Sequence, residues 1–147
     1  MLKITEKENK VVSAVIVSAG NSTRMGGINK QFLELDGVPV IVNTIKMFQR
    51  CNMIDEIIIV TRESEIDAVA KLVEKYDFYK VNNIVAGGET RQLSVYEGVT
   101  STSNIADLVV IHDGARPLVT VKVIEETIKA AAEYGAAATG VKVKDTV

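Results

Sequence analysis

Cysteine, histidine and tryptophan are almost missing from this chain of 147 residues. Cys51 is the only cysteine, His112 is the only histidine, and there is no tryptophan. A single cysteine cannot form an internal disulfide, and a metal centre built from Cys and His ligands is excluded. We therefore interpret Cys51 as a packing residue at the end of a helix rather than as a nucleophile.

An excess of charge of either sign is missing as well. The chain carries 17 basic and 19 acidic residues, so its net charge of −2 creates no overall field that attracts nucleic acid or a membrane surface. Residues 1–10 form a polar N-terminal extension without the apolar stretch of a signal peptide, and no later run is long enough to cross a bilayer. We expect a cytoplasmic protein with no nucleic-acid or membrane partner, in which any phosphate site is built locally.

The apolar residues, 47% of the chain, recur in a regular order. Short runs rich in Val and Ile predict strands at residues 12–17, 54–60, 84–86, 108–111 and 136–143. Apolar residues at spacings of three and four predict helices at 38–51, 63–76, 90–102 and 121–134, with Pro39 in a first turn and Gly135 at a C-terminal stop. Apolar strands joined by crossover helices indicate one α/β domain over residues 11–147, a Rossmann-like, doubly wound, mostly parallel sheet with helices on both faces.

The loop after the first strand is the most informative segment. It reads SAGNSTRMGG over residues 18–27, and its small residues allow backbone N–H groups to approach an anion closely. The GxxxxGK[ST] order of a Walker loop and the GxGxxG order of a dinucleotide-binding loop are both absent. Because ligands of an open parallel sheet bind beyond the carboxyl ends of the strands, we predict that this loop wraps a polyphosphate.

Two cations lie in or just after this loop, Arg24 and Lys30. Either could be a solvated surface charge. Two cations beside a turn of small residues, in a chain with no overall positive charge, favour a phosphate-binding role.

Four blocks of the sequence resemble sugar nucleotidyltransferases in their methylerythritol-phosphate cytidylyltransferase form. The blocks are SAGNSTRMGGINKQFLELDGVPV from residue 18, GGETRQLSV from residue 87, IHDGARP from residue 111 and VKVKDT from residue 141. Ile28 and Asn29 stand where the family has a proline and one more residue, and Gly114 stands where it has alanine. The family's enzymes continue beyond this chain, into a region that supplies a dimerisation arm and further sugar-phosphate ligands, so the resemblance implies a homodimer for the full-length family.

The resemblance implies transfer of CMP from CTP to 2-C-methyl-D-erythritol 4-phosphate, giving CDP-methylerythritol and pyrophosphate for isoprenoid precursor synthesis. The attacking phosphate has a second pKa of about 6, so it is already anionic and needs no general base. Fixed positive charge is what the reaction requires, and the resemblance gives Arg24 and Lys30 this catalytic role.

The resemblance also implies the binding residues. Nucleotide contacts fall on residues whose backbone or short side chains surround the predicted pocket: Ser18, Ala19, Gly20, Gly88, Glu89, Ser94, Asp113 and Gly114. The resemblance assigns binding of the sugar phosphate to Asp113, Arg116 and Thr146. Alternatively, Asp113 could cap a turn and Thr146 could be an exposed strand end. Arg91 is interpreted as a brace for the loop at residues 87–89, and His112 as structural, since alternation along a strand points it away from Asp113.

Mg²⁺ is the expected cofactor, because it bridges triphosphate oxygens and usually needs only one or two protein carboxylates. Asp113, at the end of the fourth predicted strand, is the candidate ligand.

Three other functions remain as alternatives. A ribitol-5-phosphate cytidylyltransferase would use a different sugar phosphate, and a truncated domain could hold CTP without turnover. An oxidoreductase of the Rossmann type is disfavoured by the missing glycine fingerprint. The KDT sequence at residues 144–146 favours methylerythritol phosphate over ribitol phosphate.

Overall fold

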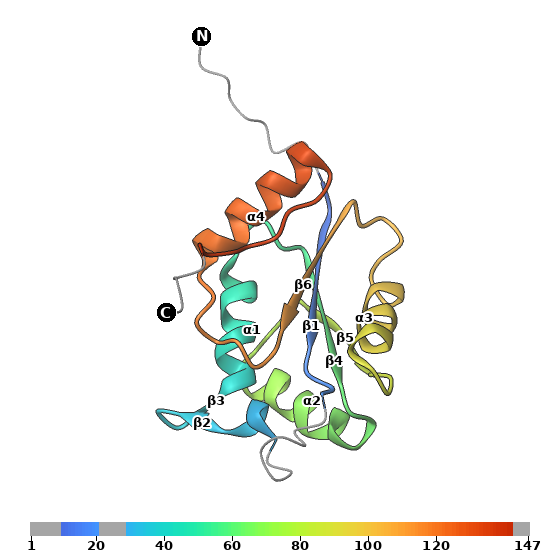
Figure 1. The fold of residues 1–147 in the computed structure, drawn as a ribbon. Helices are drawn as coiled ribbons and strands as arrows, with labels where there is room; N and C mark the ends of the chain where they lie inside the picture. The colour runs from blue at the N-terminus through green and yellow to red at the C-terminus, as the bar shows by residue number, and fades with distance from the viewer. Residues whose placement is uncertain (1–9, 21–28, 143–147) are drawn as a thin grey trace, which may run out of the picture.

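A four-stranded parallel sheet forms the centre of the computed structural model, which describes residues 10–20 and 29–142 (Figure 1). The strands lie in the order β5-β4-β1-β6. Their bounds are β1 (Val12–Val17), β4 (Glu56–Thr61), β5 (Val81–Ala86) and β6 (Leu108–Asp113). The chain adds β4 and β5 on one side of β1 and then returns to add β6 on the other side, so a topological switch point lies between β1 and β6.

Helices cover both faces of this sheet, as predicted. On one face lie α1 (Val40–Arg50), α2 (Ile66–Lys75) and α4 (Val121–Tyr134), and on the other lies α3 (Arg91–Thr100) (Figure 1). Right-handed crossovers place α1 and α2 on the same face of the sheet, because both connect strands that are added in the same direction. After β5 the chain crosses the sheet in the opposite direction to reach β6, so a crossover of the same hand places α3 on the other face. The doubly wound α/β class is therefore confirmed. Within the described ranges, no helix has the length and apolar character needed to span a bilayer.

The central strand β1 separates two apolar layers. All six of its residues are buried. Ala14 and Ile16 pack into the layer under α1, while Val15 and Val17 face the layer that includes Val95 of α3. The two-residue period of a strand sends alternate side chains to opposite faces, and here both faces are covered.

The single thiol belongs to the layer under α1. Cys51 follows the last residue of α1 and has an exposed fraction of 0%. Burial raises the pKa of the Cys51 thiol. The interpretation of Cys51 as a packing residue at a helix end is confirmed.

A small hairpin precedes α1 and was not predicted. β2 (Glu34–Leu35) pairs antiparallel with β3 (Val38–Pro39), joined by Asp36 and Gly37. Both turn residues have positive φ, 52° and 74°, which is the conformation that favours Asp-Gly in two-residue hairpin turns. The predicted helix at 38–51 therefore begins at Val40, and Pro39 is the residue before the helix rather than part of its first turn.

The fifth predicted strand is wrong over residues 136–142, which form no regular element and are all exposed. Val143, its last residue, lies outside the described residues. This run is rich in alanine, which has a low strand propensity, and the edge strand β6 pairs only with β1 among the described elements. Hydrophobic character alone was therefore a poor guide here, because a strand also requires a hydrogen-bonded neighbour.

The remaining boundaries differ by a few residues. β5 begins at Val81, earlier than predicted. The first part of this strand contains Asn82 and Asn83, and asparagine has a low strand propensity, so the apolar pattern identified only the end of the strand. The second predicted helix is divided into a short 3-10 turn, η3 (Glu63–Glu65), and α2. α4 has the predicted bounds, and Gly135 ends it with a left-handed φ of 88°.

Replacement of Gly98 by alanine tests the contact between α3 and the sheet. A Cβ at this position would lie 2.4 Å from Val15 Cγ1 and 2.8 Å from Val60 Cγ2. We expect Gly98→Ala to lower the free energy of unfolding by about 1–3 kcal/mol through overpacking, despite alanine's higher helix propensity. Urea unfolding measures the change, with exposed Glu97→Ala as the control. A Gly98→Ala protein as stable as that control would contradict the close packing of α3.

Candidate active site

A cavity of about 930 Å³ opens beyond the carboxyl ends of the four parallel strands. This is the edge where an open parallel sheet binds ligands. Its described lining includes the turn after β1, the segment after β5 and the end of β6: Val17, Ser18, Ala19, Gly20, Lys30, Arg62, Glu63, Gly87, Gly88, Glu89, Thr90, Arg91, Ser94, Asp113, Ala115 and Arg116.

The turn after β1 contributes Ser18, Ala19 and Gly20 to this cavity. Ser18 is tied to the neighbouring strand, since its backbone N and its hydroxyl both donate to Val60 O, at 2.7 and 2.8 Å. The rest of the small-residue loop, including Arg24, lies outside the described residues. Residues 18–20 thus lie at the ligand-binding edge of the sheet, and their binding of a polyphosphate stays a prediction.

Lys30 also lines the cavity and is exposed. It begins the short 3-10 turn η2 (Lys30–Phe32), for which the Asn29 side chain accepts a hydrogen bond from Gln31 N at 3.4 Å. The substitution of Ile28–Asn29 for the family's proline-containing pair therefore leaves Lys30 facing the cavity.

The segment after β5 closes against the turn after β1. A Cβ on Gly87 would lie 2.3 Å from Ala19 Cβ, so only glycine fits this approach. Ser94 is buried in α3 and its hydroxyl donates to Thr90 O at 3.0 Å and to Gly88 O at 3.3 Å. Ser94 thus reaches the Gly-Gly segment as predicted, and Gly88 and Glu89 lie beside it in the lining.

Asp113 lies between two arginines. Its Oδ1 accepts from Arg91, 3.0 Å from Nη2 and 3.3 Å from Nε, and its Oδ2 lies 3.1 Å from Arg116 Nε. Among the described residues, the side-chain polar contacts given for Arg91 are with Asp113, so Arg91 braces the end of β6 rather than the loop at 87–89. The side chains of Arg91 and Arg116 are 64% and 75% exposed, which leaves both free to contact a ligand.

Gly114, predicted alongside Asp113 as a nucleotide contact, is not among the described residues that line the cavity. Gly114 is buried, and a Cβ there would lie 2.9 Å from Ser18 Cβ. Gly114 therefore allows the turns after β1 and β6 to pack together. Thr146 lies outside the described residues.

His112 is structural, as predicted. Its ring packs against Phe48 of α1 with centroids 5.1 Å apart, and its Nε2 lies 3.0 Å from Arg116 O. The neighbouring Asp113 side chain points to the cavity instead.

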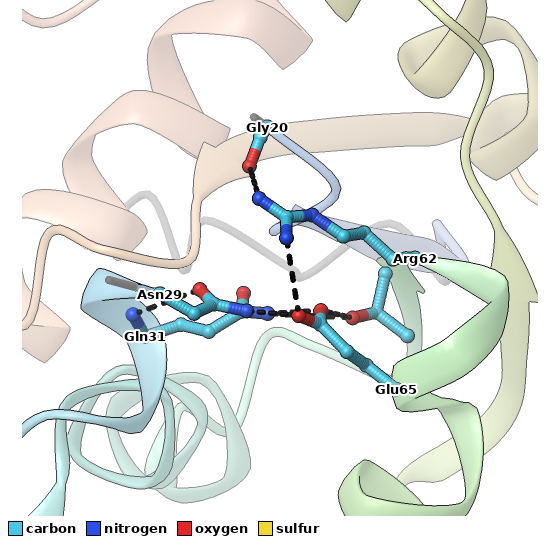
Figure 2. A network of polar contacts seen from close by, with 6 residues as sticks. Gly20, Asn29, Gln31, Arg62 and Glu65 are labelled. Atoms are coloured by element: carbon cyan, nitrogen blue, oxygen red, sulfur yellow. Dashed lines mark hydrogen bonds and ion pairs between the residues drawn. The ribbon is translucent and has the colours of Figure 1, made fainter. Parts of the chain in front are cut away.

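Arg62 and Glu63 are lining residues that sequence reasoning missed. Arg62 follows β4 and its Nη2 donates to Gly20 O at 2.8 Å (Figure 2). Its position after a strand was the signal that could have identified it.

Positive charge slightly exceeds negative charge in the described lining. The basic residues of this lining are Lys30, Arg62, Arg91 and Arg116, and the acidic residues are Glu63, Glu89 and Asp113. A chain with a net charge of −2 thus concentrates cations at this edge of the sheet, which suits a phosphorylated ligand.

Comparison with known proteins agrees with this geometry. The family model for 2-C-methyl-D-erythritol 4-phosphate cytidylyltransferase matches residues 12–147. The chain is 51% identical over 136 residues to the 2-C-methyl-D-erythritol 4-phosphate cytidylyltransferase of Clostridium acetobutylicum, covering 91% of this chain and 59% of that relative. It is 50% identical over 138 residues to the protein of the same name from Caldanaerobacter subterraneus subsp. tengcongensis, covering 92% of this chain and 61% of the relative.

A solved structure has the same fold. The 4-diphosphocytidyl-2C-methyl-D-erythritol synthase of Anaerococcus prevotii superposes with a TM-score of 0.72 at 35% identity, covering 82% of this chain and 50% of the other. The present chain thus spans about 60% of the length of the curated relatives it matches. The matched residues and these relatives show that the chain belongs to the 2-C-methyl-D-erythritol 4-phosphate cytidylyltransferase family.

Proposed function

We propose that the protein transfers the cytidylyl group of CTP to 2-C-methyl-D-erythritol 4-phosphate, forming CDP-methylerythritol and releasing pyrophosphate. The observation that carries this proposal is the meeting of Lys30, the Arg91–Asp113–Arg116 cluster and the turn at residues 18–20 in one cavity of a chain from this family. A nucleoside triphosphate and a sugar phosphate are both polyanions, and this edge of the sheet gathers the cations to hold them.

The reaction forms a bond from a phosphate oxygen of the acceptor to the α-phosphorus of CTP and breaks the bond from that phosphorus to the β-phosphate. The nucleophile is anionic near neutral pH, since its second pKa is about 6. A general base is therefore unnecessary. The protein's task is to align the two phosphates and to offset the charge that builds on the α-phosphoryl oxygens and on pyrophosphate.

On the nucleotide side, the backbone of residues 18–20 and the Lys30 ammonium would contact the triphosphate. The role proposed for Arg24 is the same, although Arg24 lies outside the described residues. Gly88 and Glu89 would contact the cytosine, and Ser94 supports them through its hydrogen bond to Gly88 O.

On the acceptor side, Arg116 would bind the phosphate of methylerythritol phosphate. Asp113 holds Arg116 in place through the 3.1 Å ion pair and holds Arg91 on its other oxygen. Thr146, also outside the described residues, would donate its hydroxyl to the same substrate.

The described residues fit a Mg²⁺ ion that is held mainly by the substrate. Among them, no group of three or more His, Cys, Asp and Glu side chains could form a metal site. Mg²⁺ bound to a triphosphate needs only one or two carboxylates, and Asp113 lines the cavity at a suitable strand end. Such an ion would neutralise part of the triphosphate charge, and Asp113 would bind it in exchange for one of its arginine contacts.

Substrate assays of the full-length protein test the proposed reaction. We expect pyrophosphate release with CTP, Mg²⁺ and methylerythritol phosphate, and no comparable release with ribitol phosphate. A coupled pyrophosphate assay measures both. Turnover with ribitol phosphate alone would support the rival transferase, and saturable CTP binding without turnover would support a binding domain.

Removal of the proposed catalytic cations tests their role. We expect Arg24→Ala and Lys30→Ala each to lower kcat by about 100-fold to 1,000-fold while weakening CTP binding much less, because the charge acts mainly on the transition state. Steady-state kinetics and CTP titration separate the two effects. Lys71→Ala, an exposed lysine on α2, is the control. Equal losses in turnover and CTP affinity would contradict the catalytic assignment.

Removal of the Asp113 charge tests the proposed metal contact. We expect Asp113→Asn to raise the Mg²⁺ concentration required for half-maximal activity by about 10-fold or more, since a neutral amide binds this cation poorly. Magnesium titration of the initial rate measures it. Asp67→Asn, an exposed carboxylate on α2, should leave the titration unchanged. An unchanged requirement in Asp113→Asn would remove Asp113 from the metal site.

A further inference from the structure

One carboxylate outside the cavity lining accepts three hydrogen bonds and forms one ion pair. Glu65, the last residue of η3, accepts on Oε2 from Gln31 Nε2 at 2.7 Å and from Thr61 Oγ1 at 3.0 Å (Figure 2). Its Oε1 accepts from Asn29 Nδ2 and lies 3.7 Å from Arg62 Nη1. An ionised carboxylate has about four lone-pair sites and no donor, so these three hydrogen bonds use most of its capacity, and the Arg62 charge lies beside the same group.

This network is largely shielded from water. Gln31 is 2% exposed, and the Glu65 side chain is 14% exposed. Gln31 also lies 3.4 Å from Thr61 Oγ1, so its buried amide depends on the end of β4 and on Glu65 for partners. Loss of the carboxylate would leave buried donors without acceptors, which costs more than the loss of an exposed hydrogen bond.

The residues that Glu65 holds flank proposed ligand contacts. Asn29 and Gln31 are the two neighbours of Lys30, and both donate to the same carboxylate. Arg62 lies 3.7 Å from Glu65 through Nη1 and donates from Nη2 to Gly20 O, so the carboxylate also supports the turn after β1 (Figure 2). Glu65 therefore links Lys30 and Gly20, which are distant in sequence, to the end of β4.

A local role in its own helix does not account for the Glu65 side chain. Glu65 is the residue before α2, but its side chain makes no capping hydrogen bond to that helix. Its side-chain partners instead come from the segment around η2 and from the end of β4.

We infer that Glu65 is a positioning residue for the transferase reaction: it fixes Lys30 and the backbone at Gly20 in the geometry that cytidylyl transfer requires. This inference rests on the proposed function, because it assigns Lys30 and Gly20 to the triphosphate. Glu65 itself is not among the described residues that line the cavity. A small displacement of a charge aimed at a reacting phosphate lowers the rate strongly and affects ground-state binding less.

Glu65→Gln in the full-length protein tests the inference by kinetics. The amide keeps the size of the side chain but replaces one acceptor with a donor and removes the charge opposite Arg62. We expect kcat to fall about 10-fold to 100-fold. The Kd for CTP should change by no more than about fivefold, as for loss of a partly exposed ion pair. The matched control is Glu74→Gln, an exposed glutamate on α2.

An exchange of partners distinguishes positioning from general destabilisation. In the double variant Gln31→Glu/Glu65→Gln, the carboxylate and amide trade places. The amide introduced at position 65 can donate to the new carboxylate at position 31, while its oxygen accepts from Asn29 and Arg62. We expect this variant to recover most of the turnover lost in Glu65→Gln. A role limited to stability would lower the midpoint of thermal unfolding in Glu65→Gln but leave kcat per folded molecule, measured well below that midpoint, equal to that of the control.

Hydrogen–deuterium exchange gives a readout that does not depend on turnover. Phe32 N and Leu33 N donate to Asn29 O and Lys30 O, so their protection reports the order of the Lys30 segment. We expect about tenfold faster exchange there in Glu65→Gln than in Glu74→Gln. If wild-type protein fails to turn over methylerythritol phosphate, the proposed reaction fails, and the exchange data still decide whether Glu65 orders the Lys30 segment. Exchange and, in an active protein, kcat that match the control would overturn the inference.

Discussion

The parallel pairing of β1 with both of its neighbours is the constraint on which the site depends. Val17 lies opposite Val60 of β4 and opposite Asp113 of β6 in the two registers. Three strand ends therefore meet at one level, and the residues that follow them share one cavity. A one-residue slip of β1 would send its side chains to the wrong apolar layers, so the packing on both faces fixes the alignment of the site.

Close approach of backbone segments completes this arrangement. Gly114 packs against Ser18, and Gly87 packs against Ala19, at separations that a Cβ would violate. Beside these turns, Arg91 and Arg116 are paired with Asp113 in the cavity lining. The site is thus assembled by turns that have little side-chain bulk of their own, and charge is supplied by longer side chains around them.

The regular parts of the fold could be predicted from sequence because their signals are local. The buried strands and the amphipathic helix at 121–134 have periodicities that each segment carries by itself. The run at 136–142 shows the limit of that reasoning, since whether an apolar segment becomes a strand depends on a partner elsewhere in the chain. Asp36 and Gly37 did carry a local hairpin signal, and it was overlooked because the flanking strands have only two residues each.

The candidate site, like the fold, could be predicted from the sequence only in part. Lys30 and Asp113 could be placed from their positions after strands and from the family's motifs. Arg62 and Glu65 could not be paired with the turn after β1 or with the segment around Lys30 in advance, because their partners Gly20, Asn29 and Gln31 lie more than 30 residues away.

Burial of Cys51 has a practical consequence. Because its sulfur is enclosed by core side chains, a thiol-specific dye reacts with it only when the domain opens. The chain therefore carries its own chemical reporter of unfolding, at a position remote from the cavity.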